Sequence, residues 1–148
     1  MGERTIVLDC DVLQADGGTR TAAITASWVA MMMAMDKLIK EKRMRKIPVR
    51  AQTAAISVGK VDGLLLLDLC YEEDSNAEVD MNVIMSDKME LIEIQASSEK
   101  NTFDRSQLNE MLDLAEGGLK QIFALQREAL LEAGVVWTNI PRSQREII

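Results

Sequence analysis

Residues 16–21 read Asp16-Gly17-Gly18-Thr19-Arg20-Thr21 and separate a short apolar run from a long one. The two glycines let the backbone turn sharply and approach a ligand closely, because neither carries a Cβ. The hydroxyl and guanidinium groups that follow fall in the first turn of an expected helix, where free N–H groups and the helix dipole favour an anion. An arginine there matches the geometry of phosphate. The stretch predicts an anion site or, as the alternative, an ordinary capped loop of a kind common before helices.

The runs on either side of this turn predict a strand and a long helix. Residues 4–14 alternate in the pattern of a strand. Residues 19–42 repeat large apolar side chains at helical spacing, and alanines occupy much of the remaining helix surface. A helix that is apolar nearly all round is covered on more than one side. We therefore expect this helix to pack against more than one neighbouring element.

The middle of the chain changes to strand-like patterns. The strand-like runs cover residues 54–61, 64–71, 79–85 and 91–95. Asp62-Gly63 between the first two runs is a strong hairpin signal, and residues 86–88 have turn character. The polar residues 72–78 connect the second run to the third. We expect an antiparallel meander over this part of the chain.

The last part of the chain begins a second long helix. Asp104 and Gln107 have the spacing of a capping box, which marks a helix start. Gly117 and Gly118 lie inside this helix and cost about 1–2 kcal/mol of helix stability, which indicates a close contact or a kink. The resulting order, β-α-ββββ-α, predicts an α+β fold with a mainly antiparallel sheet packed against two long helices.

We expect one domain over residues 1–133 and a C-terminal tail over residues 134–148. A chain of 148 residues is long enough for one domain with a substantial core and too short for two. The helical period breaks at residue 134, and Trp137 is the residue that we expect to anchor the tail.

Composition limits the chemistry and the cellular setting. The sequence contains no histidine, which excludes histidine-based nucleophilic triads and zinc sites with histidine ligands. Cys10 and Cys70 lack the spacing of a redox or metal motif, so we expect buried free thiols in a reducing compartment. No uninterrupted apolar run reaches the length of a membrane span, so we expect a cytoplasmic protein without a membrane partner.

A basic stretch over residues 36–50 allows two interpretations. Seven lysine and arginine side chains stand there against two acidic ones. They can follow the backbone of an RNA, or they can form a solvated helix end where cations complement the dipole. We favour the second interpretation, because no aromatic residue is interleaved to stack on bases. The net charge of −7 likewise gives no overall electrostatic reason to bind nucleic acid.

Carboxylates are crowded after the second strand-like run. They are Asp68, Glu72, Glu73, Asp74, Glu78 and Asp80. Because two strands joined by a short connection bring their ends together, Asp74 and Asp80 can face one cleft. Such a pair suits Mg²⁺, which prefers oxygen ligands, or one of the two can act as a general acid; the alternative is a solvated acidic loop. Together with the anion site, the pair predicts phosphoryl transfer without histidine.

Two segments make the chain similar to a known family. Residues 9–22 and residues 69–83 closely resemble bacterial ribonuclease PH, a phosphorolytic 3′→5′ exoribonuclease that trims tRNA 3′ ends. The resemblance extends from about Gly2 to about Leu130. It implies a fold similar to the second domain of ribosomal protein S5. It also implies a tRNA nucleotidyltransferase activity that releases nucleoside diphosphates.

The same resemblance implies a role for each site residue. Gly18, Thr19 and Arg20 are implied to bind inorganic phosphate, the attacking co-substrate. Asp74 and Asp80 are implied to serve catalysis and to bind Mg²⁺. In-line attack by phosphate then requires no activated nucleophilic side chain.

The family enzymes differ from this chain at the N-terminus, and the difference bears on partners. They carry an additional N-terminal portion with another phosphate-binding arginine, much of the RNA contact surface and part of the sheet. The partners that we expect are RNA, further copies in a homo-oligomer such as the family's hexamer, or a separate chain that supplies the missing portion. The alternative is a truncated, catalytically impaired or inactive paralogue that acts as an oligomerising or weak RNA-binding module.

Overall fold

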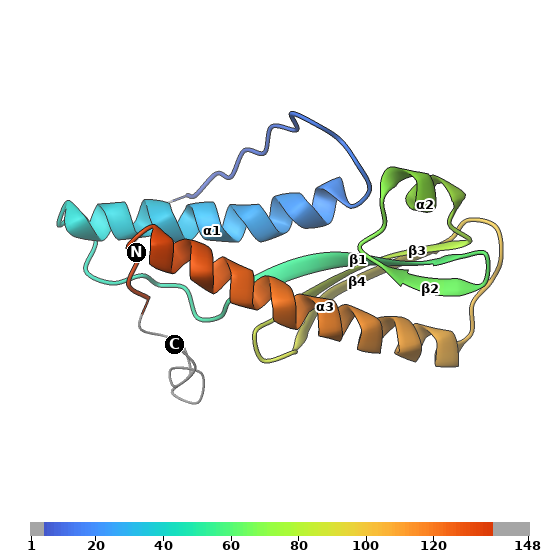
Figure 1. Cartoon of the computed structure of the whole chain (residues 1–148). Coiled ribbons are helices and arrows are strands. Elements are labelled where there is room, and N and C mark those ends of the chain that lie inside the picture. Colours follow the sequence, from blue (N-terminus) through green and yellow to red (C-terminus); the bar gives the residue numbers. More distant parts are fainter. Residues whose placement is uncertain (1–4, 138–148) are drawn as a thin grey trace.

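Two long helices pack against a four-stranded antiparallel sheet in the computed structural model, which describes residues 5–137 (Figure 1). The helices are α1 (Thr19–Lys40), the short α2 (Tyr71–Asn76) and α3 (Arg105–Glu132). The strands are β1 (Thr53–Val61), β2 (Leu64–Leu67), β3 (Val79–Ser86) and β4 (Leu91–Ser98). The α+β architecture expected from the sequence is confirmed.

The strand order is β2-β1-β3-β4, which corrects the expected meander. β1 and β2 form the expected hairpin, and Asp62 and Gly63 have the positive φ angles, 50° and 79°, that the tight turn needs. β2 ends at Leu67 instead of continuing to Tyr71. The chain turns at Asp68, whose φ is 57°, and α2 then carries it to the other edge of β1, where β3 pairs.

α2 takes the place of the loop expected over residues 72–78. Three acidic side chains in its first turn complement the positive end of the helix dipole. Glu73 Oε2 accepts the N–H of Cys70 at 2.9 Å and completes a capping box. This local chemistry ends the strand-like run early and starts a helix.

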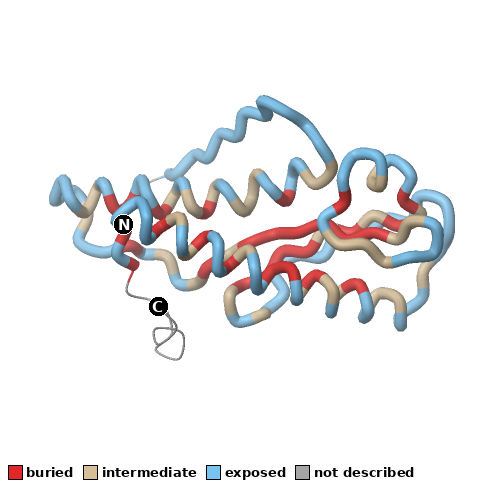
Figure 2. The backbone as a smooth tube through the Cα atoms, viewed as in Figure 1, coloured by how far each residue is buried: buried red, intermediate tan, exposed pale blue. Residues whose placement is uncertain are grey.

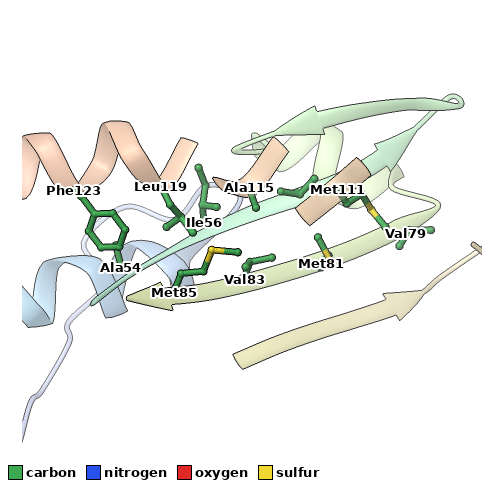
Figure 3. Packing of buried hydrophobic residues seen from close by; sticks show 11 residues of the cluster. Ala54, Ile56, Val79, Met81, Val83, Met85, Met111, Ala115, Leu119 and Phe123 are labelled. Carbon is green, nitrogen blue, oxygen red and sulfur yellow. The ribbon is translucent and has the colours of Figure 1, made fainter. Parts of the chain in front are cut away.

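α3 covers one face of the sheet and forms the main core with it (Figure 3). The buried core side chains are Ala54, Ile56, Val58, Val79, Met81, Val83, Met85, Met111, Ala115, Leu119 and Phe123. Gly118 permits the close approach, because a Cβ there would lie 2.5 Å from Ile56 Cδ1. Gly117 faces open space. The predicted close contact is therefore confirmed for Gly118 alone.

The C-terminal part of α1 and the C-terminal end of α3, with the segments that follow them, form a second buried cluster beyond the sheet. Trp28 and Trp137 meet edge to face in it, with ring centroids 5.2 Å apart. Trp137 is 7% exposed, so it anchors the start of the expected tail, as predicted. Residues 138–148 of that tail lie outside the described residues.

Residues 5–14 run alongside α1 and form no strand (Figure 1). The prediction of a strand over residues 4–14 is therefore wrong for the described part of that stretch. Alternating side chains make a strand only where a neighbouring strand takes up the backbone N–H and C=O groups. In the described part of the chain, no strand pairs with this segment. One contact with α1 joins Cys10 Sγ and Ser27 Oγ, which lie 3.1 Å apart.

Both cysteines are free thiols, as predicted, but both are exposed, which corrects the prediction that they are buried. Cys10 lies in the uncovered segment 5–14. Cys70 caps α2 instead of lying inside a buried strand. The apolar residues next to each cysteine in the sequence do not surround it with a hydrophobic core, which is why both thiols are exposed.

By length and mean hydropathy alone α1 could cross a membrane, a criterion that the core helix of a soluble protein also meets. The helix packs against β1 and α3, as an apolar core helix does. Its opposite side carries the segment 5–14 but stays largely exposed. Figure 2 shows that the buried positions gather in β1, β3 and the facing sides of the long helices.

Candidate functional site

The predicted anion site is the N-terminal end of α1, which lies beside α2 in Figure 1. α1 begins after Gly18, whose φ of 69° is left-handed. Within residues 5–137, no side chain caps the free N–H groups of this first turn, and the turn contains no acidic residue. The alternative interpretation of this stretch, a loop with an ordinary side-chain cap, is therefore not what the structure shows. The free N–H groups and the helix dipole remain available to an anion.

Gly17 and Asp16 hold this turn against α2. A Cβ on Gly17 would lie 2.0 Å from Leu69 O, so a larger residue requires the backbone to move. Asp16 Oδ1 accepts the N–H of Tyr71 at 2.5 Å and the N–H of Gly17 at 2.8 Å. These two bonds, the one from Tyr71 first, lower the pKa of the Asp16 carboxyl below its ordinary value. The turn is thereby fixed to the helix that carries Asp74.

Ser57 lies beneath the turn, on the face of the sheet that points away from α3. Its side chain alternates with those of Ile56 and Val58, which face α3. Ser57 is 2% exposed, and its Oγ has no hydrogen-bond partner among the described residues. A Cβ on Gly18 would come within 3.2 Å of that oxygen. Because a buried hydroxyl without a partner is costly, this atom marks a position that a ligand or a water can satisfy.

Arg20 is exposed in the first turn of α1 and already has an anionic partner. Its Nη2 lies 2.7 Å from Glu93 Oε1 in β4, and both side chains are nearly half exposed. A guanidinium has five donors in a planar fork, so this ion pair leaves other N–H groups for a second anion. The structure thus places Gly18, Thr19 and Arg20 in one turn, beside a carboxylate from a distant strand.

Asp74 in α2 and Asp80 at the start of β3 lie near each other. Burial raises the pKa of Asp80, and the negative charges of Asp74 and Glu99 raise it further, against a smaller lowering by the N–H of Met81. Two carboxylates suit Mg²⁺, which usually takes one or two from the protein and keeps several waters. Among the described residues, no group of three or more acidic or cysteine side chains forms a larger metal site.

The register of the sheet connects the two halves of the predicted site. Ser57 is paired with Asn82, and Asp80 stands two residues earlier on β3. Because side chains two residues apart share a face of the sheet, Asp80 lies on the face that carries Ser57 beneath the α1 turn. Residues from both sequence segments therefore belong to one region of the molecule.

Asp16, Ser57 and Glu93 are the residues of this region to which the sequence analysis assigned no role. For Asp16 a signal was present, because aspartate before glycine often accepts hydrogen bonds from a turn. For Ser57 and Glu93 no local signal exists. Their positions follow from strand pairing and from the way α1 docks on the sheet.

Comparisons with known proteins show which family the chain resembles. Residues 51–118 match the 3′ exoribonuclease family, domain 2. A protein named Ribonuclease PH from Crocosphaera subtropica is 53% identical over 133 residues, which are 90% of this chain and 55% of that protein. Ribonuclease PH from Bacillus cereus is 54% identical over 131 residues, 88% of this chain and 54% of that protein.

A solved structure supports the fold alone. The crystal structure of rice Rrp46 superposes with a TM-score of 0.62 at 18% identity and covers 80% of this chain and 51% of that one. The likeness agrees with the expected fold of the second domain of ribosomal protein S5.

The comparisons therefore place the chain's likeness within the 3′ exoribonuclease family, whose domain 2 model matches residues 51–118. The particular member that it resembles is ribonuclease PH, so the resemblance carried by residues 9–22 and 69–83 is confirmed. The chain spans about half the length of the curated relatives it matches.

Proposed function

We propose that this chain carries the phosphate-binding turn and the carboxylates of a phosphorolytic 3′→5′ exoribonuclease, a nucleotidyltransferase acting on tRNA 3′ ends. The observation that carries the proposal is the uncapped N-terminal end of α1, held by Gly17 and Asp16 against the helix that bears Asp74. Identity above one half to proteins named Ribonuclease PH supports the reaction class.

Inorganic phosphate is the attacking group. The N–H groups at the start of α1 bind its oxygens, Thr19 offers a hydroxyl, and Arg20 offers the N–H groups that Glu93 leaves free. The buried hydroxyl of Ser57 lies under the same turn. Because the bound phosphate is itself the nucleophile and is held in position for attack, the reaction needs no activated side-chain nucleophile.

The bond changes are those of a phosphoryl transfer. One oxygen of hydrogen phosphate attacks the phosphorus of the last phosphodiester linkage. The bond from that phosphorus to the 3′ oxygen of the preceding nucleotide breaks, and the 3′ oxygen takes up the proton that the phosphate brought. The terminal nucleotide leaves as a nucleoside diphosphate. Asp74 and Asp80 would hold Mg²⁺, which when bound neutralises charge on the transferred phosphate oxygens.

The test is an assay of the full chain with a tRNA precursor, Mg²⁺ and phosphate. A second arm adds the portion of ribonuclease PH that this chain does not cover. Release of nucleoside diphosphates that requires phosphate supports the proposal. Arg20→Ala and Asp80→Asn abolish it, whereas Arg105→Ala, an exposed arginine at the start of α3, leaves it unchanged. Absence of diphosphates in both arms contradicts the proposal.

The alternative, an oligomerising module, is favoured by one observation. All eight residues of β4 are exposed, and Leu91, Ile92 and Ile94 in this edge strand are between 40% and 56% exposed. An apolar edge strand with unpaired backbone groups is a template for a further strand. Association that disappears with Ile92→Lys but persists with Leu125→Lys, an exposed leucine of α3, supports this function; a monomer at all concentrations contradicts it.

A further inference from the structure

A pocket lies at the end of α1 that is farthest from the predicted phosphate site. Residues 45–50 line it together with Ile39, Val136 and Trp137, and its volume is about 450 Å³. α1 has 22 residues, so at ~1.5 Å per residue the two ends of the helix are about 30 Å apart. We call this cavity the basic pocket, and nothing in the predicted phosphate site depends on it.

Three cations of the basic pocket have no acidic partner in the part of the chain that the structure describes. Arg45, Lys46 and Arg50 are exposed and make no ion pair within residues 5–137. The whole chain carries a net charge of −7, so carboxylates are plentiful elsewhere. Three cations gathered at one cavity of an acidic protein, unpaired among the described residues, create a local positive field that attracts anions.

Helix capping does not account for these cations. The N–H groups of Glu41, Lys42, Arg43 and Met44 already donate to carbonyls in the last turn of α1. Lys40 lies in that turn, pairs with Asp36 at 2.6 Å and also donates to the carbonyl of Gly134. Arg45 and the residues after it stand beyond the helix end, and the dipole effect fades within the last turn.

The base of the pocket is buried and contains both apolar and polar groups. Trp137 packs edge to face on Trp28, and Ile47 is buried in the same cluster. Trp137 Nε1 is buried and has no hydrogen-bond partner within the described residues. Ile39 and Val136 add apolar surface beside the cations. A ligand that suits these walls carries both an anionic group and an apolar body.

We propose that the basic pocket binds a nucleotide of RNA through its phosphate, at a distance from the 3′ end that reacts. The proposal rests on the proposed function for the presence of RNA, and it reverses the sequence-based preference for a merely solvated helix end. The three cations bind the phosphate, and the apolar wall contacts the ribose or base. No aromatic face is needed, because the phosphate supplies most of the attraction.

The test is a fluorescence titration of the full chain with a short oligoadenylate, with adenosine monophosphate and with inorganic phosphate. The two tryptophans of the sequence are Trp28 and Trp137; Trp137 lines the basic pocket and packs against Trp28, so their emission reports on binding in this pocket. The triple substitution Arg45→Ala, Lys46→Ala and Arg50→Ala weakens oligoadenylate binding at least tenfold and lowers the salt slope of binding by ~0.7, as expected for the loss of one phosphate contact.

Arg43→Ala is the matched control, because Arg43 is a neighbouring arginine that pairs with Glu41 and does not line the pocket. It leaves binding unchanged, and unfolding curves confirm that all variants are folded. Arg20→Ala also leaves the oligoadenylate signal in place while it abolishes phosphorolysis, so failure of the proposed function and failure of this inference are distinguishable. Equal binding by the triple variant and the control overturns the proposal. Saturation by inorganic phosphate as tight as by oligoadenylate overturns the assignment to RNA.

Discussion

Arg20 and Glu93 join the first turn of α1 to the edge strand β4 through an ion pair of 2.7 Å between Nη2 and Oε1. The pair is nearly half exposed at both ends and contributes little to the stability of the fold. We expect the pair to affect phosphate binding instead. The Glu93 carboxylate occupies a donor of Arg20 and places a negative charge beside the turn that we propose to bind phosphate.

Replacing Glu93 by glutamine should therefore strengthen phosphate binding. The loss of a competing and repelling charge at an exposed site raises the affinity about twofold to fivefold at low salt and less at high salt. Calorimetric titration with inorganic phosphate at two ionic strengths measures the change. Glu128→Gln, an exposed carboxylate of α3, is the control and has no effect. Weaker binding by Glu93→Gln would show that the carboxylate orients Arg20 and does not compete with phosphate.

Gly17→Ala should disrupt the phosphate turn. The added Cβ would lie 2.0 Å from Leu69 O, a backbone atom that can move only with α2. The expected loss is about 1–3 kcal/mol of unfolding free energy, as for other overpacked sites, together with a loss of phosphate affinity. Urea unfolding and phosphate titration measure the two effects. Unchanged stability and affinity would mean that the turn does not press on α2.

The paired glycines of α3 should respond in opposite directions to alanine. Gly117 faces open space, so Gly117→Ala stabilises the protein by about 0.5–1 kcal/mol through helix propensity. Gly118→Ala places a Cβ 2.5 Å from Ile56 Cδ1 and 2.8 Å from Leu67 Cδ2. Both neighbours are side-chain ends that can shift, so the cost is about 1–3 kcal/mol. Thermal unfolding of the two variants gives the comparison, and equal shifts would rule out the packing of α3 described above.

Acid should release the turn from α2 through Asp16. Its pKa in the folded chain lies below the ordinary value of 3.8, because Tyr71 and Gly17 donate hydrogen bonds to the carboxylate. The stabilisation is therefore complete above the unfolded pKa and is lost as the pH falls through the lower folded pKa. Nuclear magnetic resonance of the Gly17 and Tyr71 amides during acid titration follows the release. Asp16→Asn should remove that titration step. If the step survives the substitution, it belongs to a group other than Asp16.

The long helices, the Asp62-Gly63 hairpin and the capping box at Asp104 could be predicted because each depends on neighbours in sequence. Helical spacing, a turn with positive φ and a reciprocal cap act within a few residues. The segment 5–14 shows the limit of such reasoning. Its alternation is that of a strand, but a strand also needs a partner, and alternation does not provide one.

The sequence by itself determined the chemistry that is local: a glycine turn at the start of a helix, an arginine beside it, carboxylates close together at Asp74 and Asp80, and no histidine. Only the tertiary structure decided which of these groups meet. β3 pairs with β1 and not with β2, which puts Asp80 on the face beneath Gly18, and the docking of α1 gives Arg20 its partner Glu93. Contacts between distant segments depend on how apolar faces and backbone groups are satisfied over the whole chain, and no short stretch of sequence contains that information.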